Sequence, residues 1–553
     1  MNIEARQCEK CHKDFTMQAD DIPFYEKMDL PLPTMCPFCR FKYLLAFWVN
    51  GRFRITKSAL SGKTIITVIP ESVPFPIYER NEFVSDECDP LTCGKEYDSS
   101  KPFIEQITEL QSKVPHPHNV GAKNINCDWA DDVWESKDAY LTRSCLKVDT
   151  VNYGYRIMNC KNCVDVTFSF DLERCYDCLN CFKSYNLNYS FNSRDCMDSF
   201  FLYDCRNCQN CFMSWNLRNK KYHILNQPYS KEDYEKKLEE YNLKSRATAE
   251  KLKKEFWQHI GNDAIHRQNY NIQAVNSTGN FLENDKNCQE CYFIQESENC
   301  RYIFRGYKNK ETIDSVGGLD TEKVTLGSID QIAYNNLCCL YTTNCRYSYY
   351  LDSCEETEYC FGCVGLRKKK YCILNKQYTK EEYENLVEKI KSDMKNRGEW
   401  GKFWPLSSAY CGYNLSLAHM QFPMTKEEAL NFGAKWEESA EPHYDSIINA
   451  DTLPDNIDEV KDDIIKQRIL CPETKLSYNI TKEELQFYRE RGIPLPQRHF
   501  DWRTLDRYKP FSLMTALQRG SCVYCNKEIE HYYDLELEFQ KIACLECYQR
   551  EVA

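Results

Sequence analysis

Eight cysteines near the two ends of the chain have a spacing suited to metal binding. They form four C-x2-C pairs, two at each end. A C-x2-C turn presents two sulfurs on one side, and two such turns supply the tetrahedral four-sulfur shell that Zn2+ prefers. We therefore predict at least two zinc ions, one per set. The alternatives are an iron centre, because four sulfurs alone do not exclude iron, and thiols without a metal. The ligands are Cys8, Cys11, Cys36 and Cys39 at the amino end, and Cys522, Cys525, Cys544 and Cys547 at the carboxyl end.

Further cysteines between the ends have spacings that additional metal ions could use. One group has the pattern C-x2-C-x11-C-x2-C, and a second group follows it. The alternative is a column of reduced thiols that pack in the core as small apolar groups. These residues are Cys160, Cys163, Cys175, Cys178, Cys181, Cys196, Cys205, Cys208 and Cys211.

No residue set points to catalysis. The sequence contains no G-x-S-x-G, G-x-G-x-x-G or H-E-x-x-H motif, so we assign no catalytic or cofactor-binding residue. Four thiolate ligands also leave zinc no open position for a substrate. We expect a protein that is not an enzyme, with a thiol- or metal-dependent enzyme as a further alternative.

The overall charge argues against general binding to polyanions. The chain has 71 Lys and Arg against 83 Asp and Glu, a net charge of -12. One local patch, Arg40, Arg52 and Arg54 among aromatic residues, could still contact phosphates and stack on bases. The alternative is that these aromatics belong to the core, with the arginine stems lying along them.

The two ends of the chain are copies of one another. Phe24-Tyr25 through Arg40 aligns without gaps on Phe487-Tyr488 through Arg503, an offset of 463. At this offset each copy lacks one of the two cysteine sets, since Cys522 and Cys525 fall on Ala59 and Gly62. Loss of a site in each copy favours a structural role for the metal, because packing can replace a structural ion. In the carboxyl copy the positions of Cys11, Cys36 and Cys39 are held by Thr474, His499 and Trp502.

The middle of the chain has a short repeat. Cysteines recur every 15 residues, as at Cys145, Cys160 and Cys175, and aromatic and aliphatic columns follow the same step. A short fixed period with strand-type alternation predicts stacked β-coils, so we expect a β-solenoid with about 15 residues per coil. A row of zinc knuckles without a continuous sheet is the alternative.

A second tract repeats the first at an offset of 149. Leu217 to Asn226 matches Leu366 to Asn375, and both blocks run into helix starts, at Ser230 and Thr379. We predict a multidomain, mainly β protein, in which terminal zinc-ribbon or treble-clef-like modules flank two tandem Cys-rich solenoids, each followed by a capping helix.

The predicted segments follow from these features. They are an amino-terminal zinc ribbon (1–60), a connecting domain (61–126), the first solenoid (127–228), a helical cap (229–262), the second solenoid (263–377), a second cap (378–400), a Pro-containing connector (401–463) and a carboxyl-terminal zinc ribbon (464–553).

The chain has no long apolar run. The longest compact one, Leu44 to Val49, is far short of the ~20 residues that cross a bilayer, and the amino terminus has no leader pattern. We expect a cytoplasmic protein, where a reducing environment disfavours disulfides. We expect a protein partner, with RNA possible through the terminal modules and no membrane or small-molecule substrate.

The order of features resembles a known group of proteins. The F-Y-x5-P-L-P-x2-C-x2-C-R core that ends at Arg40 is similar to domains classed as probable zinc ribbons in bacterial genomes. Nearly the whole chain, including the terminal C-L-E-C-Y-Q, resembles a cysteine-rich family known chiefly from uncultivated bacteria with reduced genomes. The resemblance implies intracellular zinc binding and no particular activity. Cysteines that the family would place near Ala59 and Gly62 are absent.

Together these observations favour a non-enzymatic, zinc-binding scaffold that presents solenoid surfaces to a protein partner. The alternative is a ribosome- or RNA-associated zinc-ribbon factor.

Overall fold

The structure is a computed structural model that describes residues 4–438 and 447–552. The chain forms two compact units. The first contains the chain up to Asn119 together with Asn269–Glu437, and the second contains Val120–Gln268 together with the chain from Glu438 onward. Each unit therefore combines one terminal module with the strand-rich tract that lies farther from that module in the sequence.

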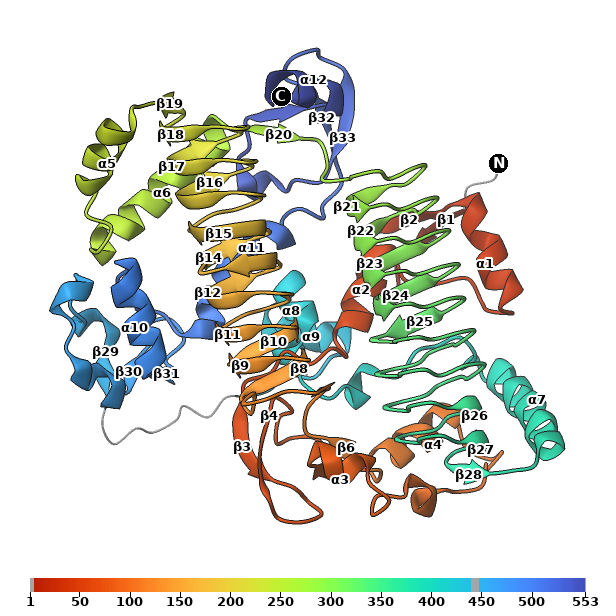
Figure 1. Cartoon of the computed structure of the whole chain (residues 1–553). Helices are drawn as coiled ribbons and strands as arrows, with labels where there is room; N and C mark the ends of the chain where they lie inside the picture. Colours follow the sequence, from red (N-terminus) through yellow and green to blue (C-terminus); the bar gives the residue numbers. More distant parts are fainter. Residues whose placement is uncertain (1–3, 439–446, 553) are drawn as a thin grey trace. The chain divides into compact units, whose positions relative to one another are not determined.

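The strand-rich part of the second unit, here called the first tract, is built from short strands that pair in parallel, apart from an antiparallel pair at its end (Figure 1). Its strands are β7 (Gly121–Ala122), β8 (Ala130–Trp134), β9 (Lys137–Tyr140), β10 (Thr142–Leu146), β11 (Asp149–Asn152), β12 (Lys161–Thr167), β13 (Phe170–Glu173), β14 (Tyr176–Leu179), β15 (Phe182–Asn188), β16 (Met197–Tyr203), β17 (Gln209–Trp215), β18 (Lys221–Ile224) and β19 (Gln227–Pro228).

The second tract, in the first unit, has the same organisation. Parallel single-residue bridges continue the pairing between its fifth and sixth strands. Its strands are β21 (Gly279–Glu283), β22 (Cys291–Gln295), β23 (Arg301–Tyr307), β24 (Ile313–Leu319), β25 (Thr325–Ser328), β26 (Glu358–Phe361), β27 (Lys370–Ile373) and β28 (Lys376–Gln377).

Paired residues in both tracts are mostly twelve positions apart, so the predicted step of 15 is wrong. Val151 pairs with Cys163 in the first tract, and Ile303 pairs with Ser315 in the second. The reason is a shorter repeat of three residues. A step of 15 is also a multiple of three, so it links side chains that share the interior but are not paired.

The three-residue repeat has a backbone cause. Every third residue through most of both tracts has a positive φ, for example Asn159, Asn162 and Asp165 at 52°, 50° and 56°. Asn and Asp tolerate this left-handed conformation better than most residues. The residue after each left-handed position faces the interior, which is why the cysteines recur at multiples of three. In the first tract these buried residues include Cys145, Val151, Ile157, Cys160, Cys163, Val166, Leu172, Cys175, Leu187 and Leu202.

Helices follow each tract at the predicted positions. Ser230 accepts a hydrogen bond from the Asp233 backbone N–H at the start of its helix, and Thr379 forms a capping box with Glu382. The helices are α5 (Lys231–Glu239) and α6 (Arg246–Asn262) after the first tract, and α7 (Lys380–Asn396), α8 (Leu417–Gln421) and α9 (Lys426–Phe432) after the second.

The amino-terminal module consists of two antiparallel hairpins and short helices. The strands are β1 (Glu4–Gln7), β2 (Asp14–Met17), β3 (Arg54–Lys57), β4 (Thr64–Thr67), β5 (Ile77–Tyr78) and β6 (His116–Pro117). The helices are α1 (Ile22–Lys27), α2 (Pro37–Leu45), α3 (Arg80–Val84) and α4 (Phe103–Gln111).

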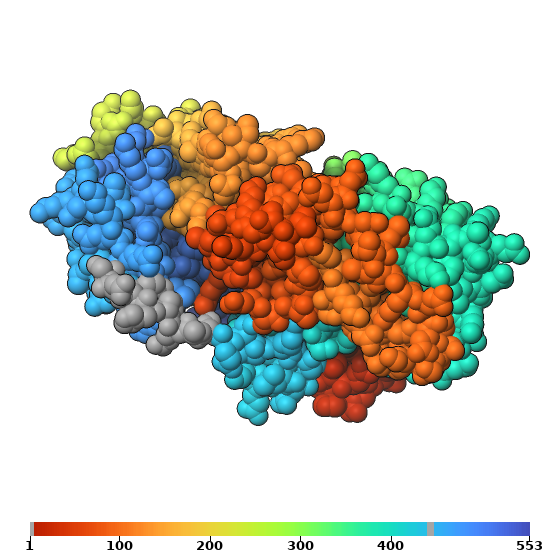
Figure 2. Space-filling model, turned by 90° about the horizontal axis from the view of Figure 1, so that it is seen from below, coloured from red at the N-terminus to blue at the C-terminus, as the bar shows by residue number. Residues whose placement is uncertain are grey.

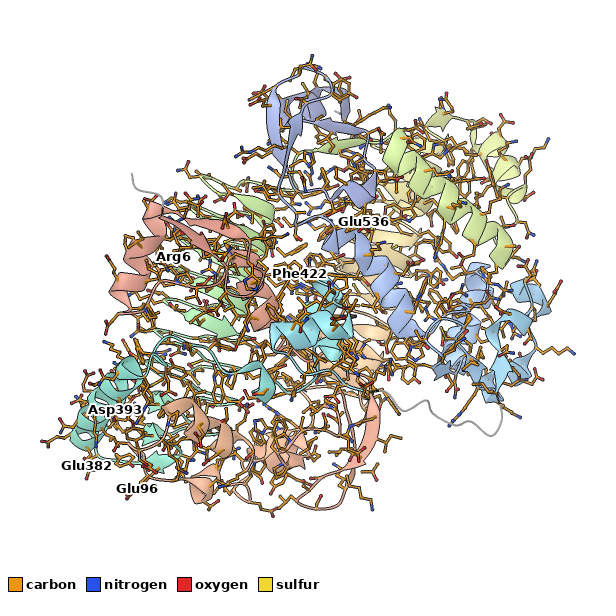
Figure 3. The ribbon with its side chains drawn as sticks, turned by 180° about the vertical axis from the view of Figure 1, so that it is seen from behind. Arg6, Glu96, Glu382, Asp393, Phe422 and Glu536 are labelled. Atoms are coloured by element: carbon orange, nitrogen blue, oxygen red, sulfur yellow. The ribbon has the colours of Figure 1, made fainter. Side chains whose placement is uncertain are left out.

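Within the first unit, the chain beside α4 contacts the end of the second tract and α7. The Tyr97 hydroxyl donates to Asp393 at 2.8 Å, and Lys376 pairs with Glu96 at 2.5 Å; Glu96 and Asp393 are labelled in Figure 3. Figure 2 shows the corresponding surface, where orange residues of the module lie against teal residues near α7.

After its first strand, the carboxyl-terminal module has the same order as β1 to β4 of the amino-terminal module, namely a hairpin, two helices and a second hairpin. The strands are β29 (Ile448–Asn449), β30 (Ile469–Leu470), β31 (Ser477–Tyr478), β32 (Gln518–Ser521), β33 (Glu528–His531) and β34 (Lys541–Ala543). The helices are α10 (Lys482–Arg491), α11 (Phe500–Ser512) and α12 (Leu545–Val552), and β34 pairs in parallel with β20 (Ile265–Arg267).

Replacing Lys368 by Val should destabilise the second tract. Lys368 is exposed and left-handed, with φ 51°. A β-branched residue is strained there, and we expect the free energy of unfolding to fall by ~1–2 kcal/mol, whereas Lys368→Asn should change it little. Urea unfolding measures the difference. The same exchange at the strand residue Lys370 is the control, and an equal loss there would contradict the role of the left-handed position.

Candidate metal centres and the contacts that anchor them

The amino-terminal cysteines converge on one point. Their four Sγ atoms lie within 4.8 Å of one another. Cys8 and Cys11 stand in the turn between β1 and β2, where the Cys8 N–H donates to Lys13 O and the His12 N–H donates to Cys8 O. Cys36 is the residue before α2, and its N–H donates to Cys8 Sγ at 3.3 Å. A hairpin turn and a helix start therefore contribute two sulfurs each.

The carboxyl-terminal set is built in the same way. Its four Sγ atoms also lie within 4.8 Å of one another, from the β32–β33 turn and the start of α12. The Cys522 N–H donates to Lys527 O and the Asn526 N–H donates to Cys522 O, which reproduces the amino-terminal turn. Cys525 is exposed, and its Sγ lies 3.8 Å from that of Cys544.

Both groups fit a metal ion that prefers thiolate ligands. A hydrogen bond from Cys39 lowers the pKa of the Cys36 thiol to about 5. Burial works against ionisation of Cys522, but backbone hydrogen bonds from Cys544 and Cys525 lower its pKa to about 6. Four sulfurs at this spacing could hold one ion in a closed tetrahedral shell, as Zn2+ takes in structural sites. Within the described ranges these two groups are the sites that gather three or more such ligand atoms.

Each module keeps the backbone of the site that it lacks. In the carboxyl module the Cys471 N–H donates to Leu476 O and the Lys475 N–H to Cys471 O, the same turn as at Cys8. The position of Cys36 is held by His499, which caps α11 by accepting a hydrogen bond from the Asp501 N–H at 3.2 Å. Protein hydrogen bonds therefore hold the turn and the helix start where the ligands are missing.

The amino module shows the converse replacement and corrects the alignment. Arg54 matches Gln518 and Thr64 matches Glu528, an offset of 464, so Cys522 and Cys525 fall on Ser58 and Ser61 and not on Ala59 and Gly62. Both serine hydroxyls donate to the carboxylate of Glu82, on α3. A Ser-Ser-Glu hydrogen-bond cluster thus stands where the other module has four cysteines.

The tract cysteines are arranged as packed thiols. Their Sγ atoms contact backbone carbonyls, as from Cys163 to Lys161 O at 3.2 Å, and burial raises the pKa of Cys160 to about 12. Within the described chain, no three of them form a group whose ligand atoms all lie within 4.8 Å of one another. Metal binding stays a prediction at Cys160, Cys163, Cys175, Cys178, Cys181, Cys196, Cys205, Cys208 and Cys211, which are not among the candidate groups of the described chain.

A buried arginine joins the amino module to the second tract. Arg40, the residue after the ligand Cys39, pairs with Asp314 of β24 at 2.7 Å, and both are at most 2% exposed. The Tyr25 hydroxyl accepts from Arg40 at 2.6 Å, and the guanidinium lies 4.4 Å from the ring centre of Tyr302. Burial opposes the charge on Arg40, but Asp314 raises its pKa above the usual value.

The second unit has the equivalent contact. Arg503 of α11 pairs with Asp165 of β12 at 2.8 Å and lies 4.7 Å from the ring centre of Tyr153. Tyr153 donates to Glu484 at 2.9 Å, as Tyr302 donates to Asp21 at 2.6 Å in the first unit. Arg40 and Asp21 of the amino module correspond to Arg503 and Glu484 at the module offset of 463. The tract residues Asp165 and Tyr153 correspond to Asp314 and Tyr302 at the tract offset of 149.

Sequence comparison alone missed the acidic half of this contact. The signal was present, because Asp165 and Asp314 are related by the same offset of 149 as the two tracts. Nothing in the sequence showed which module each acid would meet. The pairing of Arg40 also corrects one expectation, since a buried guanidinium has no access to a phosphate.

The remaining two arginines of that patch lie elsewhere. Arg52 is exposed, and Arg54 is half-buried, with its Nε donating to Ile69 O at 2.7 Å. Their contact with nucleic acid stays a prediction.

Comparison with known proteins gives no assignment. No family model matches the chain, and no curated protein matches it. Among the described helices, none combines the length and the apolar character needed to cross a bilayer.

Metal analysis should find two zinc ions per chain. Cys36→Ser and Cys522→Ser should each reduce the content to one ion, because each removes a ligand from a different group. Cys205→Ser, at a tract thiol, should leave both ions in place and serves as the control. Inductively coupled plasma mass spectrometry of the purified chain measures this, and four or more ions would place metal in the tracts.

Arg40→Met should destabilise the first unit by ~3–5 kcal/mol, because it leaves Asp314 charged and buried without its partner. Adding Asp314→Leu should recover part of the loss. Chemical denaturation measures the free energy of unfolding, and amide hydrogen exchange in β24 shows whether the loss is located at this contact. Lys27→Met, which removes an exposed pair with Glu311, is the control and should cost less than about 1 kcal/mol. If Arg40→Met lowers the free energy of unfolding no more than Lys27→Met does, the buried pair is not important for stability.

Proposed function

We propose that the protein is a non-enzymatic zinc-binding scaffold in which each terminal module clamps one tract. The tracts are proposed to be β-solenoids with twelve-residue coils, and the ion in each four-cysteine group is proposed to be Zn2+. The scaffold presents the uncovered tract surfaces to a protein partner.

The observation that carries the proposal is the position of the residue after the last ligand in each group. Arg40 follows Cys39 and reaches Asp314, and Tyr548 follows Cys547 and donates to Asp204. Arg218 of the first tract also donates to the Tyr548 hydroxyl at 2.7 Å. In both units a metal ligand is thus one residue away from a buried contact with the tract.

The helix start links these two features physically. Cys36 precedes α2 as its cap residue, and Cys39 and the contact residue Arg40 follow within about one helical turn. A metal that fixes the two sulfurs also fixes the direction from which the guanidinium approaches Asp314. Ion binding is then coupled to module–tract docking, as metal binding is coupled to folding in other small zinc modules.

The chemistry of the groups supports a structural role for the ion. A shell of four thiolates leaves no position for a substrate or an activated water. Apart from Cys127, the tract thiols of the described chain are buried, which limits the access of a dissolved substrate to them.

Loss of the amino-terminal metal should loosen the tract that is distant in sequence. In Cys36→Ser/Cys39→Ser we expect faster amide exchange in β23–β25 of the second tract and unchanged exchange in β12–β17 of the first, which follows the module more closely along the chain. Hydrogen exchange with mass spectrometry measures both in one sample.

The carboxyl-terminal pair supplies the matched control. Cys544→Ser/Cys547→Ser should give the opposite pattern, with faster exchange in the first tract only. Unchanged exchange in both tracts, or a change confined to the tract next in sequence, would overturn the proposal.

A further inference from the structure

Each tract carries an open groove along one face. The groove of the first tract has a volume of about 550 Å3 and that of the second about 650 Å3. In the first tract its lining residues lie on or beside β13 and β15–β18. The strands β15–β18 are labelled in Figure 1. One column of directly paired residues forms its floor, namely Glu173, Tyr185, Met197, Gln209 and Lys221.

The two grooves are equivalent under the duplication. The column of the second groove is Lys310, Glu322, Tyr334, Arg346 and Glu358. At the offset of 149, Glu173 corresponds to Glu322 and Tyr185 to Tyr334. Asp171 likewise corresponds to Asp320. Both grooves therefore contain two carboxylates two residues apart, and a tyrosine that pairs with the second of them.

A contact that two residues of the second groove, Glu322 and Tyr334, make with the adjacent Lys323 shows which chemical group suits this arrangement. Lys323 places its ammonium 3.6 Å from the Glu322 carboxylate and 5.1 Å from the ring centre of Tyr334, and it donates to the tyrosine hydroxyl at 3.1 Å. A cation beside a carboxylate and over an aromatic ring is favoured by both contacts. The side chain that fills this place comes from the tract itself.

The first groove lacks this internal cation. The residue that corresponds to Lys323 is Arg174, and its guanidinium pairs with Glu490 at 3.9 Å. Asp171 accepts a hydrogen bond from Asn159 at 2.9 Å. Tyr185 and Met197 are 38% and 47% exposed. Glu173 and Tyr185 therefore lack the lysine contact that the second tract supplies, although Lys183 and Lys221 line the same groove.

We propose that the groove of the first tract binds a polypeptide segment of a partner by taking up a lysine or arginine side chain between Asp171, Glu173 and Tyr185. The exposed Met197 would contact the neighbouring apolar side chain of that segment, since methionine adapts to varied shapes. This inference rests on the proposed scaffold function, because it names the surface and the kind of partner.

The charges of the groove favour a basic peptide over RNA. Its carboxylates are Asp171, Glu173 and Asp195, against the two cations Lys183 and Lys221. The chain as a whole carries a net charge of -12. The excess of carboxylates in the groove and the negative net charge of the chain both repel a phosphate backbone and attract a cationic segment.

The exposed methionine provides the readout. In full-length zinc-loaded protein with 13C-methyl-labelled methionine, the Met197 signal is assigned by comparison with Met197→Leu. The probe is a nine-residue Gly/Ser peptide that carries one lysine followed by one leucine. We expect saturable shifts of the Met197 signal, and about five-fold weaker binding of the same peptide with acetylated lysine.

Charge-removing variants locate the site. Asp171→Asn/Glu173→Gln should weaken binding of the lysine peptide about five-fold, because it removes the exposed carboxylates that face the ammonium. The matched control is Glu232→Gln/Glu239→Gln on α5, which removes two exposed carboxylates of the same unit and should leave affinity within about two-fold. The other methionine signals check that each variant remains folded.

Three results would overturn the inference. The first is an unchanged Met197 signal at a saturating concentration of the lysine peptide. The second is binding of the acetylated peptide with equal affinity. The third is a shift of the Met197 signal with a nine-nucleotide oligouridylate and none with the peptide. If any of these occurs while metal loss still loosens the tracts as predicted, the groove assignment fails and the scaffold function stands. If the exchange pattern also fails, the proposed function fails with it.

Discussion

In each unit a buried arginine–aspartate ion pair joins the terminal module to its tract. Arg40 with Asp314, and Arg503 with Asp165, place a guanidinium from a terminal module against a carboxylate of a tract, with a tyrosine ring beside each arginine. Desolvation makes such a pair costly unless both partners are present and correctly oriented. The contact therefore contributes more to the choice of partner than to net stability, because a module docked without the acid would bury an unpaired charge.

Metal binding and hydrogen bonding are interchangeable ways of holding the ends of these modules. Four cysteines fix one turn and one helix start in each module, while Ser58, Ser61 and Glu82 hold the equivalent turn in the amino module. In the carboxyl module, His499 caps the helix start at the position that corresponds to Cys36. Because the backbone turn is common to all four places, a metal can be lost where side-chain hydrogen bonds keep the same geometry. This supports the proposal that an ion bound by either four-cysteine group would maintain shape.

Inside the tracts, sulfur acts as a small core side chain. A left-handed residue at every third position leaves one inward residue in three, and cysteine, serine, valine and leucine occupy those places. Spacing alone could not separate this arrangement from metal binding, because a C-x2-C pair also has its cysteines three residues apart. The distinction lies in whether four sulfurs meet at one point, which they do at the ends and do not in the described tracts.

The sequence by itself determined the two cysteine groups at the ends that could hold a metal, the duplication of the modules and the tracts, and the helix starts at Ser230 and Thr379, because these are local patterns of residue type and spacing. It also located the inward columns, since both 12 and 15 are multiples of three. Only the tertiary structure decided the twelve-residue step, because strand pairing selects among multiples of the repeat. The tertiary structure alone also decided that each module joins the tract that is more distant from it in the sequence. The buried acids that select this tract lie hundreds of residues from their arginines.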